Sequence, residues 1–501
     1  MHPALSIDEI LCRIFYFCSE YDQRSLLFAA QTCKAWTDPA LDLLWRRLHS
    51  LGPLLLLLPG ITISNDEYIY TDSGSTGDLR LFNSYARRVK HISNKQRLRI
   101  NPSMTSRLRS AYTNGTQLSN LTTAHISIHK TNSFLLPYHI SSKLSRLNID
   151  IGFQRQEADI FAVLCEYLEH VHFLCDDLRH LSLRGLADKR LNEVIAGMQR
   201  LETISLRLGR TLSLETVTAI KTFPYLTELE IHAGHLAVDL SDEIYQANNL
   251  QSFPSLKKLT IRAQSPLIEN LIQCVQNNTL NYLHIELEDS TSHSSWDTIF
   301  TSITLKASLT LHHLSLEHHY EIPEQPIFIA SGATHSTQGT DPTDTSMRFD
   351  TLQILSKLKS LRHFTLDLTL PTITSDDVVD KIISWWPNLE HFELGLFSQV
   401  DDITNITNSV KISTAVLPLF ASKCPKLNRL IIPLAIDEIP VLYPLPWIPL
   451  PSELRNLTIA RLNTPDPIEL GQFLRKLFPN LERLEGPCDD AQMWIDVNNR
   501  L

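Results

Sequence analysis

Cysteine is scarce and scattered in this chain. Eight cysteines are spread over 501 residues, with no C-x-x-C pair and no dense cluster. Small secreted proteins that depend on disulfides need such clusters to hold a small core together. The spacing therefore excludes a disulfide scaffold, and we expect buried thiols in a reducing compartment.

Long apolar runs are also missing. Leu54–Leu58 is only five leucines, and the run Ile431–Leu450 is interrupted by five prolines and by Asp437 and Glu438. A membrane-spanning helix needs about 18 uninterrupted apolar residues. The first residues lack the basic start and apolar core of a signal peptide. We expect no membrane partner and a cytoplasmic or nuclear protein.

Positive charge is in deficit. The chain has 45 Lys and Arg against 55 Asp and Glu, a net charge of −10, and a pI near 6.0. Nucleic acids and anionic membranes are bound by clustered Lys and Arg, so neither is an expected partner. Hydrophobic content of 43% and charged content of 20% are typical of a folded protein. A protein partner is the expectation.

Recognisable catalytic motifs are absent too. The sequence contains no G-x-S-x-G, no phosphate-binding G-x-x-x-x-G-K-[ST], no H-E-x-x-H and no dinucleotide glycine fingerprint. Four histidines lie close together at His312, His313, His318 and His319. Neighbouring residues of a strand point to opposite faces, so fewer than three of these would converge on one metal ion. We expect no cofactor and no metal, which leaves open an enzyme whose residues assemble only in three dimensions.

The first fifty residues contain three short amphipathic stretches. In the first, apolar residues from Ile7 to Phe15 recur at steps of three and four, and Ser6 with Glu9 forms a capping-box pattern that predicts a helix beginning at Ile7. A second apolar series runs from Leu26 to Trp36, and a third follows Pro39. So small a segment has too little interior for three apolar stripes. Some apolar surface should therefore remain for a partner.

These stretches carry a family resemblance. Residues 4–48 are similar to the F-box, the module that docks on the Skp adaptor of cullin ubiquitin ligases. The motifs are Glu9-Ile10-Leu11, Ile14-Phe15, Leu26-Leu27, Thr32-Cys33-Lys34-Ala35-Trp36 and Leu44-Trp45-Arg46-Arg47-Leu48. The proline usual before Glu9 is absent. The alternative interpretation is a helical cap that only packs against the following domain.

A Leu-x-x-Leu-x-Leu pattern recurs through the rest of the chain, with several successive starts 23 to 27 residues apart and longer gaps between the others. This period is typical of leucine-rich repeats, in which each unit supplies one short strand and a helix. A weaker first copy lies at Leu121/Ala124/Ile126. The other copies begin at Leu144, Leu178, Leu201, Leu226, Leu256, Leu280, Leu311, Leu361, Leu389, Leu427, Leu454 and Leu481.

The predicted fold class is therefore α/β. A three-helix F-box at 1–50 precedes a junction at 51–100 and a leucine-rich-repeat horseshoe at 101–501, with a parallel sheet on the concave face and helices on the convex face. Within the junction, 66–78 is expected to be a loop and 81–89 the first convex helix. Residues 321–349 are expected to be a flexible insertion. The asparagine usual after the third leucine is missing from most copies, which predicts an irregular curve with looser loops.

Two sets of contact residues follow. The resemblance implies adaptor docking by residues of the three helices, although some must form the module's own core; they are Ile10, Leu11, Ile14, Leu26, Leu27, Trp36 and Trp45. Residues flanking the second and third leucine positions should point away from the core. The side chains at these positions are basic in the early repeats and acidic in the middle repeats. The expected target-binding residues on this face are Arg184, Arg207, Lys258, Arg262, His313 and His363. We expect the four cations to face acidic groups of a target.

The resemblance implies a non-catalytic substrate receptor. Its F-box would bind the Skp adaptor and, through it, a cullin, while the repeats hold a target protein for ubiquitin-dependent degradation. Proximity alone accelerates transfer, because tethering raises the effective concentration of the target. The alternative is an interaction scaffold that binds the adaptor, or nothing, and never directs degradation.

Overall fold

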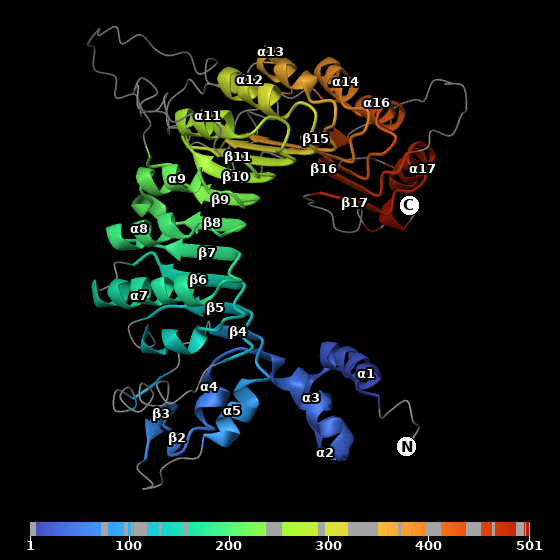
Figure 1. The fold of residues 1–501 in the computed structure, drawn as a ribbon. Helices are drawn as coiled ribbons and strands as arrows, with labels where there is room; N and C mark the ends of the chain where they lie inside the picture. Colours follow the sequence, from blue (N-terminus) through green and yellow to red (C-terminus); the bar gives the residue numbers. More distant parts are fainter. Residues whose placement is uncertain are drawn as a thin grey trace, which may run out of the picture. The chain divides into compact units, whose positions relative to one another are not determined.

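The computed structural model separates into two compact units, Met1–Leu226 and Thr227–Leu501. Figure 1 shows the elements of both. The structure describes residues 7–71, 79–94, 99–101, 104, 118–129, 133–154, 158–236, 253–288, 296–318, 349–368, 373, 375–395, 412–436, 452–462, 466–486, 495 and 497–499. The insertion predicted at 321–349 lies outside these ranges except for Phe349, which begins a helix.

Three helices open the first unit: α1 (Asp8–Tyr21), α2 (Gln23–Thr32) and α3 (Lys34–Arg46). Asp22 separates the first two and accepts a hydrogen bond from the Arg24 N–H at 2.9 Å, so it caps α2. The Thr37 hydroxyl donates to the Ala30 carbonyl at 2.9 Å and ties α3 to the end of α2. The buried core between the helices consists of Leu11, Phe15, Leu26, Ala30 and Ala40.

Two predictions about these helices are wrong in detail. Helix α1 begins at Asp8, and its N-cap is Ile7, which makes no side-chain capping bond, while Ser6 lies outside the described residues. The third helix begins at Lys34, well before Pro39, so Trp36 belongs to α3 and not to the second apolar series. Pro39 is tolerated in the second turn of α3, where it removes a single intrahelical hydrogen bond.

The first unit continues as a parallel sheet. Its strands, in sheet order, are β1 (Arg47–Leu48), β4 (His91–Asn94), β5 (Thr123–Ser127), β6 (Arg146–Gly152), β7 (His180–Gly185) and β8 (Thr203–Arg207). Short helical elements connect them: α4 (Gly52–Leu55), α5 (Arg80–Ala86), η2 (Ser133–His139), α7 (Ala158–Leu174), α8 (Lys189–Gly197), η3 (Gly209–Thr211) and α9 (Leu214–Ile220). The α3 helix therefore leads directly into the first strand of the sheet.

The junction differs from its prediction. An antiparallel hairpin of β2 (Ile61–Ser64) and β3 (Glu67–Tyr70) occupies part of the segment expected to be a loop. Its alternating isoleucines and tyrosines outweigh the polar residues that follow. Helix α5 ends at Ala86, with Leu81 exposed and Val89 buried beyond the helix.

The second unit is also a parallel sheet backed by helices (Figure 1). Its strands, in sheet order, are β9 (Glu228–His232), β10 (Lys258–Ala263), β11 (Tyr282–Leu287), β12 (His313–His318), β13 (His363–Leu368), β14 (His391–Leu394), β15 (Arg429–Ile436), β16 (Asn456–Leu462) and β17 (Arg483–Glu485). Its helices are α11 (Ser265–Cys274), α12 (Trp296–Ala307), α13 (Phe349–Gln353), η5 (Ile354–Lys357), α14 (Asp376–Trp385), α16 (Val416–Lys423) and α17 (Pro467–Leu477).

The repeat pattern is confirmed strand by strand. Strands β5 to β16 each carry one copy of the motif, and its second and third apolar residues are buried, as Leu283 and Ile285 are in β11. Strand β17 carries a shortened copy, in which Leu484 is buried. Backbone hydrogen bonds repeat with the same period. The N–H groups of His312 and His313 both donate to the Asn281 carbonyl, at 2.9 and 3.1 Å, and the same pairing recurs between other neighbouring units. The observed α/β leucine-rich-repeat fold is therefore the one predicted from the spacing of the leucine motif.

The cysteines differ in exposure. Cys165, Cys175 and Cys424 are buried, and burial raises the pKa of their thiols to about 11, 11 and 12, so they are inert at neutral pH. Cys12 is exposed on α1, contrary to the expectation that all cysteines are buried. Within the described ranges, no helix combines the length and apolar character that crossing a bilayer requires.

His139, in η2, should make the stability of the chain depend on pH. The side chain is fully buried, its Nδ1 donates to the Leu135 carbonyl at 3.1 Å, and burial lowers its pKa from 6.5 to about 4. Between these values the unfolded chain binds more protons, so stability falls as the pH falls. Urea unfolding of the wild type should lose about 2 kcal/mol more between pH 7 and pH 5 than unfolding of His139→Leu. Equal losses in the two proteins would contradict this assignment.

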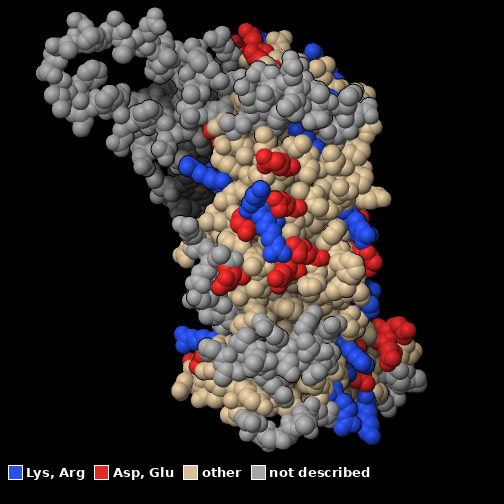
Figure 2. Space-filling model, turned by 60° about the vertical axis from the view of Figure 1, so that its left-hand side comes forward, with Lys and Arg blue, Asp and Glu red and all other residues tan. Residues whose placement is uncertain are grey.

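On the face drawn in Figure 2, acidic and basic side chains are interspersed among uncharged residues.

Candidate functional site

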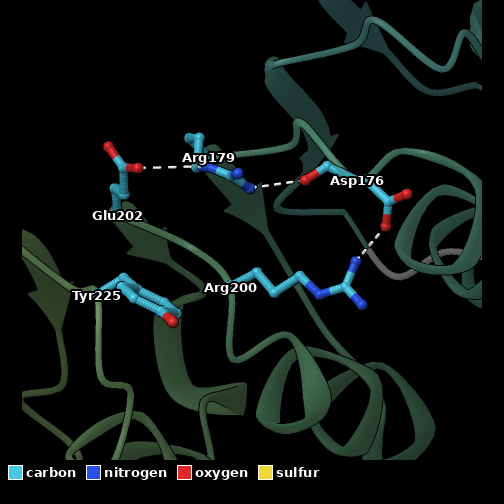
Figure 3. Close-up of a pocket in the computed structure, with 5 residues that line it drawn as sticks. All are labelled: Asp176, Arg179, Arg200, Glu202 and Tyr225. Carbon is cyan, nitrogen blue, oxygen red and sulfur yellow. Dashed lines mark hydrogen bonds and ion pairs between the residues drawn. The ribbon is translucent and has the colours of Figure 1, made fainter.

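A hollow in the first unit is the first candidate. It has a volume of about 490 Å³ and is lined by Asp176, Arg179, Arg200, Glu202 and Tyr225 (Figure 3). Arg179 lies 3.2 Å from the Glu202 carboxylate, and Arg200 pairs with Asp176. The two arginines and two carboxylates therefore neutralise one another. This arrangement supplies no excess charge with which to hold an ionic ligand.

The three N-terminal helices offer a different kind of surface. Among the described residues, seven of the eighteen exposed large hydrophobic side chains lie between Ile7 and Phe28. We call them the N-terminal apolar surface; they are Ile7, Ile10, Ile14, Tyr16, Phe17, Leu27 and Phe28. Single exposed hydrophobics are ordinary, but such a concentration on two adjacent helices indicates a contact surface for a protein.

The structure divides the sequence-predicted docking residues. Ile10, Ile14 and Leu27 belong to the N-terminal apolar surface, with exposed fractions of 38, 40 and 45%. Leu11 and Leu26 are only 1% exposed and form the core between the helices. They cannot contact a partner directly, because the helices would have to separate to release them.

Both predicted tryptophans are half-buried and packed within the chain. Trp36 meets Phe15 edge to face, with ring centroids 5.6 Å apart. Trp45 lies against Tyr85 of α5, with centroids 4.5 Å apart. Their rings therefore stabilise the helices and their attachment to the sheet. We leave Leu11, Leu26, Trp36 and Trp45 out of the contact surface.

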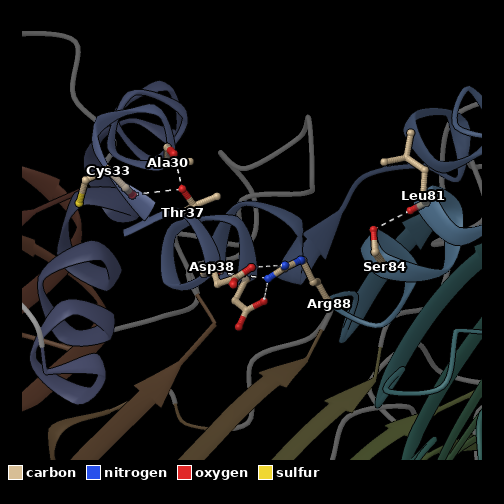
Figure 4. A network of polar contacts seen from close by, with 8 residues as sticks. Ala30, Cys33, Thr37, Asp38, Leu81, Ser84 and Arg88 are labelled. Carbon is tan, nitrogen blue, oxygen red and sulfur yellow. Dashed lines mark hydrogen bonds and ion pairs between the residues drawn. The ribbon is translucent and has the colours of Figure 1, made fainter. Parts of the chain in front are cut away.

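A polar network also holds α3 to the junction that precedes the first repeat (Figure 4). The Arg88 guanidinium pairs with Asp38 and Asp42 of α3 and donates to the Asp38 carbonyl at 3.3 Å. The Arg88 side chain is 19% exposed, whereas the two carboxylates are 75 and 61% exposed. Together with the β1–β4 pairing, this network fixes the orientation of α3 on the sheet.

Sequence reasoning missed four residues of the N-terminal apolar surface: Ile7, Tyr16, Phe17 and Phe28. Phe17 follows Ile10 and Ile14 at helical spacing, so the periodicity could have found it. Phe28 is 67% exposed and sits outside the apolar stripe of α2. The sequence signal that could have identified Phe28 is an aromatic side chain outside the apolar stripe of its helix.

The predicted target-binding arginines of the first unit occupy register-equivalent positions on β7 and β8. Arg184 pairs with Arg207 in the sheet. The Arg184 guanidinium lies 3.0 Å from the Asp150 carboxylate and 4.9 Å from the centre of the Phe153 ring. Its charge is therefore already matched within the chain.

The predicted cations of the second unit are matched as well. Arg262 lies 2.8 Å from the Glu286 carboxylate and also pairs with Glu288. The Lys258 ammonium lies over the Tyr282 ring, 4.8 Å from its centre. These contacts weaken the hypothesis that the cations are reserved for acidic groups of a target, because a new contact of Arg184, Arg262 or Lys258 would displace an existing one.

His313 and His363 occupy equivalent positions on β12 and β13, with ring centroids 5.4 Å apart. The two target-binding histidines expected from the sequence are thus brought together. His319 lies outside the described ranges. In the part of the chain that the structure describes, no group of three or more His, Cys, Asp or Glu side chains could hold a metal ion.

Comparison with known proteins identifies the N-terminal domain. Residues 8–50 match the family model described as F-box-like. The chain is similar to an internalin from Listeria monocytogenes, with 14% identity over 78% of this chain and 95% of that one, and a TM-score of 0.37. It is also similar to the yeast Rad7 and Elc1 complex, with 14% identity, coverage of 76 and 82%, and a TM-score of 0.35. No curated protein sequence matches the chain. Residues 8–50 are therefore an F-box-like domain, and it is followed by an α/β leucine-rich-repeat fold.

Proposed function

We propose that this chain is the substrate-recognition subunit of a Skp–cullin–F-box ubiquitin ligase. Its N-terminal helices would bind a Skp-type adaptor, and its repeats would bind a target protein. The observation that carries this proposal is the N-terminal apolar surface, of which six of the seven residues lie within the F-box-like domain. An adaptor that supplies apolar side chains would bury this surface and gain the free energy of removing it from water.

The attachment of the helices to the sheet supports the same function. The α3 helix continues into β1, and Arg88 with the Trp45–Tyr85 pair braces it against the junction that precedes the first repeat. A braced helix would hold a bound adaptor in a fixed orientation relative to the first strands of the sheet. Catalysis would then come from the ubiquitin carrier, with this non-catalytic subunit contributing proximity in the cytoplasm or nucleus.

Purification of the full chain with candidate partners tests the proposal. The full chain should elute with a Skp adaptor on size-exclusion chromatography, and the pair should then capture a cullin. A complex that holds the adaptor but excludes the cullin would favour the scaffold. A chain that captures no adaptor at micromolar concentration would overturn the proposal.

A further inference from the structure

One long stretch of this acidic chain contains no acidic residue. Residues 79–149 include 12 Lys or Arg and no Asp or Glu. The whole chain has a net charge of −10, so the residues outside this stretch carry −22. A concentration of one sign of charge in a chain of the opposite sign indicates a surface for a charged partner.

Six described cations gather at one edge of the sheet in the first unit, where β1, β4, β5 and β6 begin. Strands β4, β5 and β6 lie side by side in Figure 1, and β1 pairs with β4. Each of the six lies at the first strand position, directly before it, or in the turn that leads to it. We call them the basic edge; its members are Arg46, Arg47, Arg87, Lys90, Lys143 and Arg146.

The members of the basic edge are near one another. The Lys90 N–H donates to the Arg46 carbonyl at 3.0 Å. Burial, followed by the charges of Arg46, Arg47 and Lys90, lowers the pKa of His91, so these three cations surround one imidazole. Arg47 and Arg146 are connected in register through β4 and β5. Three strand spacings place their backbones about 14 Å apart.

The positive charge of the basic edge is not compensated by the chain. Within the described residues, none of its six members pairs with a carboxylate, and the Lys143 ammonium donates to the Asn120 Oδ1 at 2.7 Å. Asp150 is the one carboxylate on β1, β4, β5 and β6, and it pairs with Arg184. Five of the six side chains are exposed, and Arg46 is half-buried. These cations are therefore available to an anionic partner.

The next repeats show the opposite arrangement at the same edge. Arg179 lies 3.2 Å from the Glu202 carboxylate, and Arg200 pairs with Asp176. The Arg179 N–H donates to the Ser145 carbonyl at 3.0 Å, which places Arg179 one strand beyond the basic edge. Ion pairs along this edge are thus sterically possible. Their absence from β1 to β6 is a property of these particular repeats.

We propose that the basic edge binds an extended acidic segment of the target protein. Identifying the ligand as a target rests on the proposed function. An arginine fork can donate two hydrogen bonds to one carboxylate. Alternate side chains of an extended segment lie on the same side, about 7 Å apart, so three acidic side chains span the 14 Å between Arg47 and Arg146. Several such contacts are needed, because one exposed ion pair contributes little.

The length of the basic edge favours a short acidic segment over a nucleic acid. About five extended residues span 14 Å. A DNA duplex adds about 3.4 Å per base pair and continues as a polyanion past both ends of the edge. The residues outside 79–149 carry −22 and would repel those parts of the duplex.

Peptide binding to the full chain tests the proposal. The probes are fluorescein-labelled nonapeptides that alternate serine with glutamate or with arginine, and a labelled DNA duplex of 20 base pairs. Fluorescence anisotropy gives the Kd. The glutamate peptide should bind at least tenfold more tightly than the arginine peptide, and the duplex no more tightly than the glutamate peptide. Equal affinity for the two peptides, or tighter binding of the duplex, would overturn the proposal.

Matched variants locate the binding. Lys90→Gln/Arg146→Gln should weaken binding of the glutamate peptide roughly tenfold, because it removes two of the six cations. Lys189→Gln/Arg210→Gln removes the same charge from exposed positions of later repeats in the same unit and should leave the Kd unchanged. Equal weakening by both double variants would show nonspecific attraction to positive charge and refute a local site.

A second pair at the same edge guards against a variant that fails to fold. Arg87→Gln/Lys143→Gln should also weaken binding of the glutamate peptide. Thermal melting of each double variant should match that of the wild type, because all the altered side chains are exposed. An unchanged Kd in both edge variants would contradict the proposal.

Adaptor capture, measured on the same samples, separates the two proposals. The altered residues lie outside residues 8–50, so each variant should capture a Skp adaptor as the wild type does. Capture without binding of the glutamate peptide would overturn the basic-edge proposal alone. Peptide binding without capture would overturn the ligase function and leave the anion-binding surface standing.

Discussion

Replacement of both Leu27 and Phe28 by alanine should abolish capture of a Skp adaptor at micromolar concentration. The two side chains are adjacent on α2 and are 45 and 67% exposed. Truncation of one buried apolar anchor in an interface costs on the order of 2 kcal/mol. Two such losses amount to about 4 kcal/mol, or roughly a thousandfold in Kd, and coupling between neighbouring residues should leave at least a hundredfold. Titration calorimetry with purified adaptor measures the change.

The same variant should fold normally. Neither side chain contributes to the buried core of the helices, so the expected change in the free energy of unfolding is within about 0.5 kcal/mol. Leu305→Ala/Leu309→Ala provides a control, because these leucines are 71 and 70% exposed in the second unit and lie outside the F-box-like domain. Undiminished adaptor binding by Leu27→Ala/Phe28→Ala would exclude the N-terminal apolar surface as the docking site.

Phe392→Ala should lower the free energy of unfolding by about 3–5 kcal/mol, as is typical when a buried phenylalanine is replaced by alanine. Phe392 is fully buried on β14, and its ring lies 5.9 Å from Phe364 of the preceding unit and 5.3 Å from Phe420 on α16 of its own unit. In a repeat array each unit is stabilised mainly by its neighbours, so the cavity would weaken both the interface with the preceding unit and the packing of α16 on the sheet. Urea unfolding followed by tryptophan fluorescence measures the loss.

The effect of Phe392→Ala should be local. Adaptor binding by the F-box-like domain should persist at 25 °C, because the cavity lies in the other compact unit. Phe173→Ala removes the same side chain from an 80% exposed position on α7 and should change stability by no more than about 0.5 kcal/mol. A similar loss in both variants would mean that burial between repeats does not govern the stability of this chain.

Much of the fold could be predicted from local patterns. The Leu-x-x-Leu-x-Leu spacing located strands β5 to β17, because a strand whose alternate residues are buried must show apolar residues two apart. Strands β1 and β4 were not predicted, because they carry no full copy of the motif. The three N-terminal helices were predicted from the spacing of their apolar residues. The predicted start of the third helix was wrong, because Pro39 inside the helix resembles a helix boundary.

The candidate site depended far more on contacts between distant residues. The sequence alone determined the leucine-rich strands, the three helices and the F-box-like motifs, because spacing along the chain reports which faces of an element are apolar. Only the tertiary structure decided that Leu11 and Leu26 fill a core, that Tyr85 covers Trp45, and that Tyr282 stacks on histidines from later repeats. Exposure and stacking depend on which elements pack together, and a local pattern of apolar residues does not specify that packing.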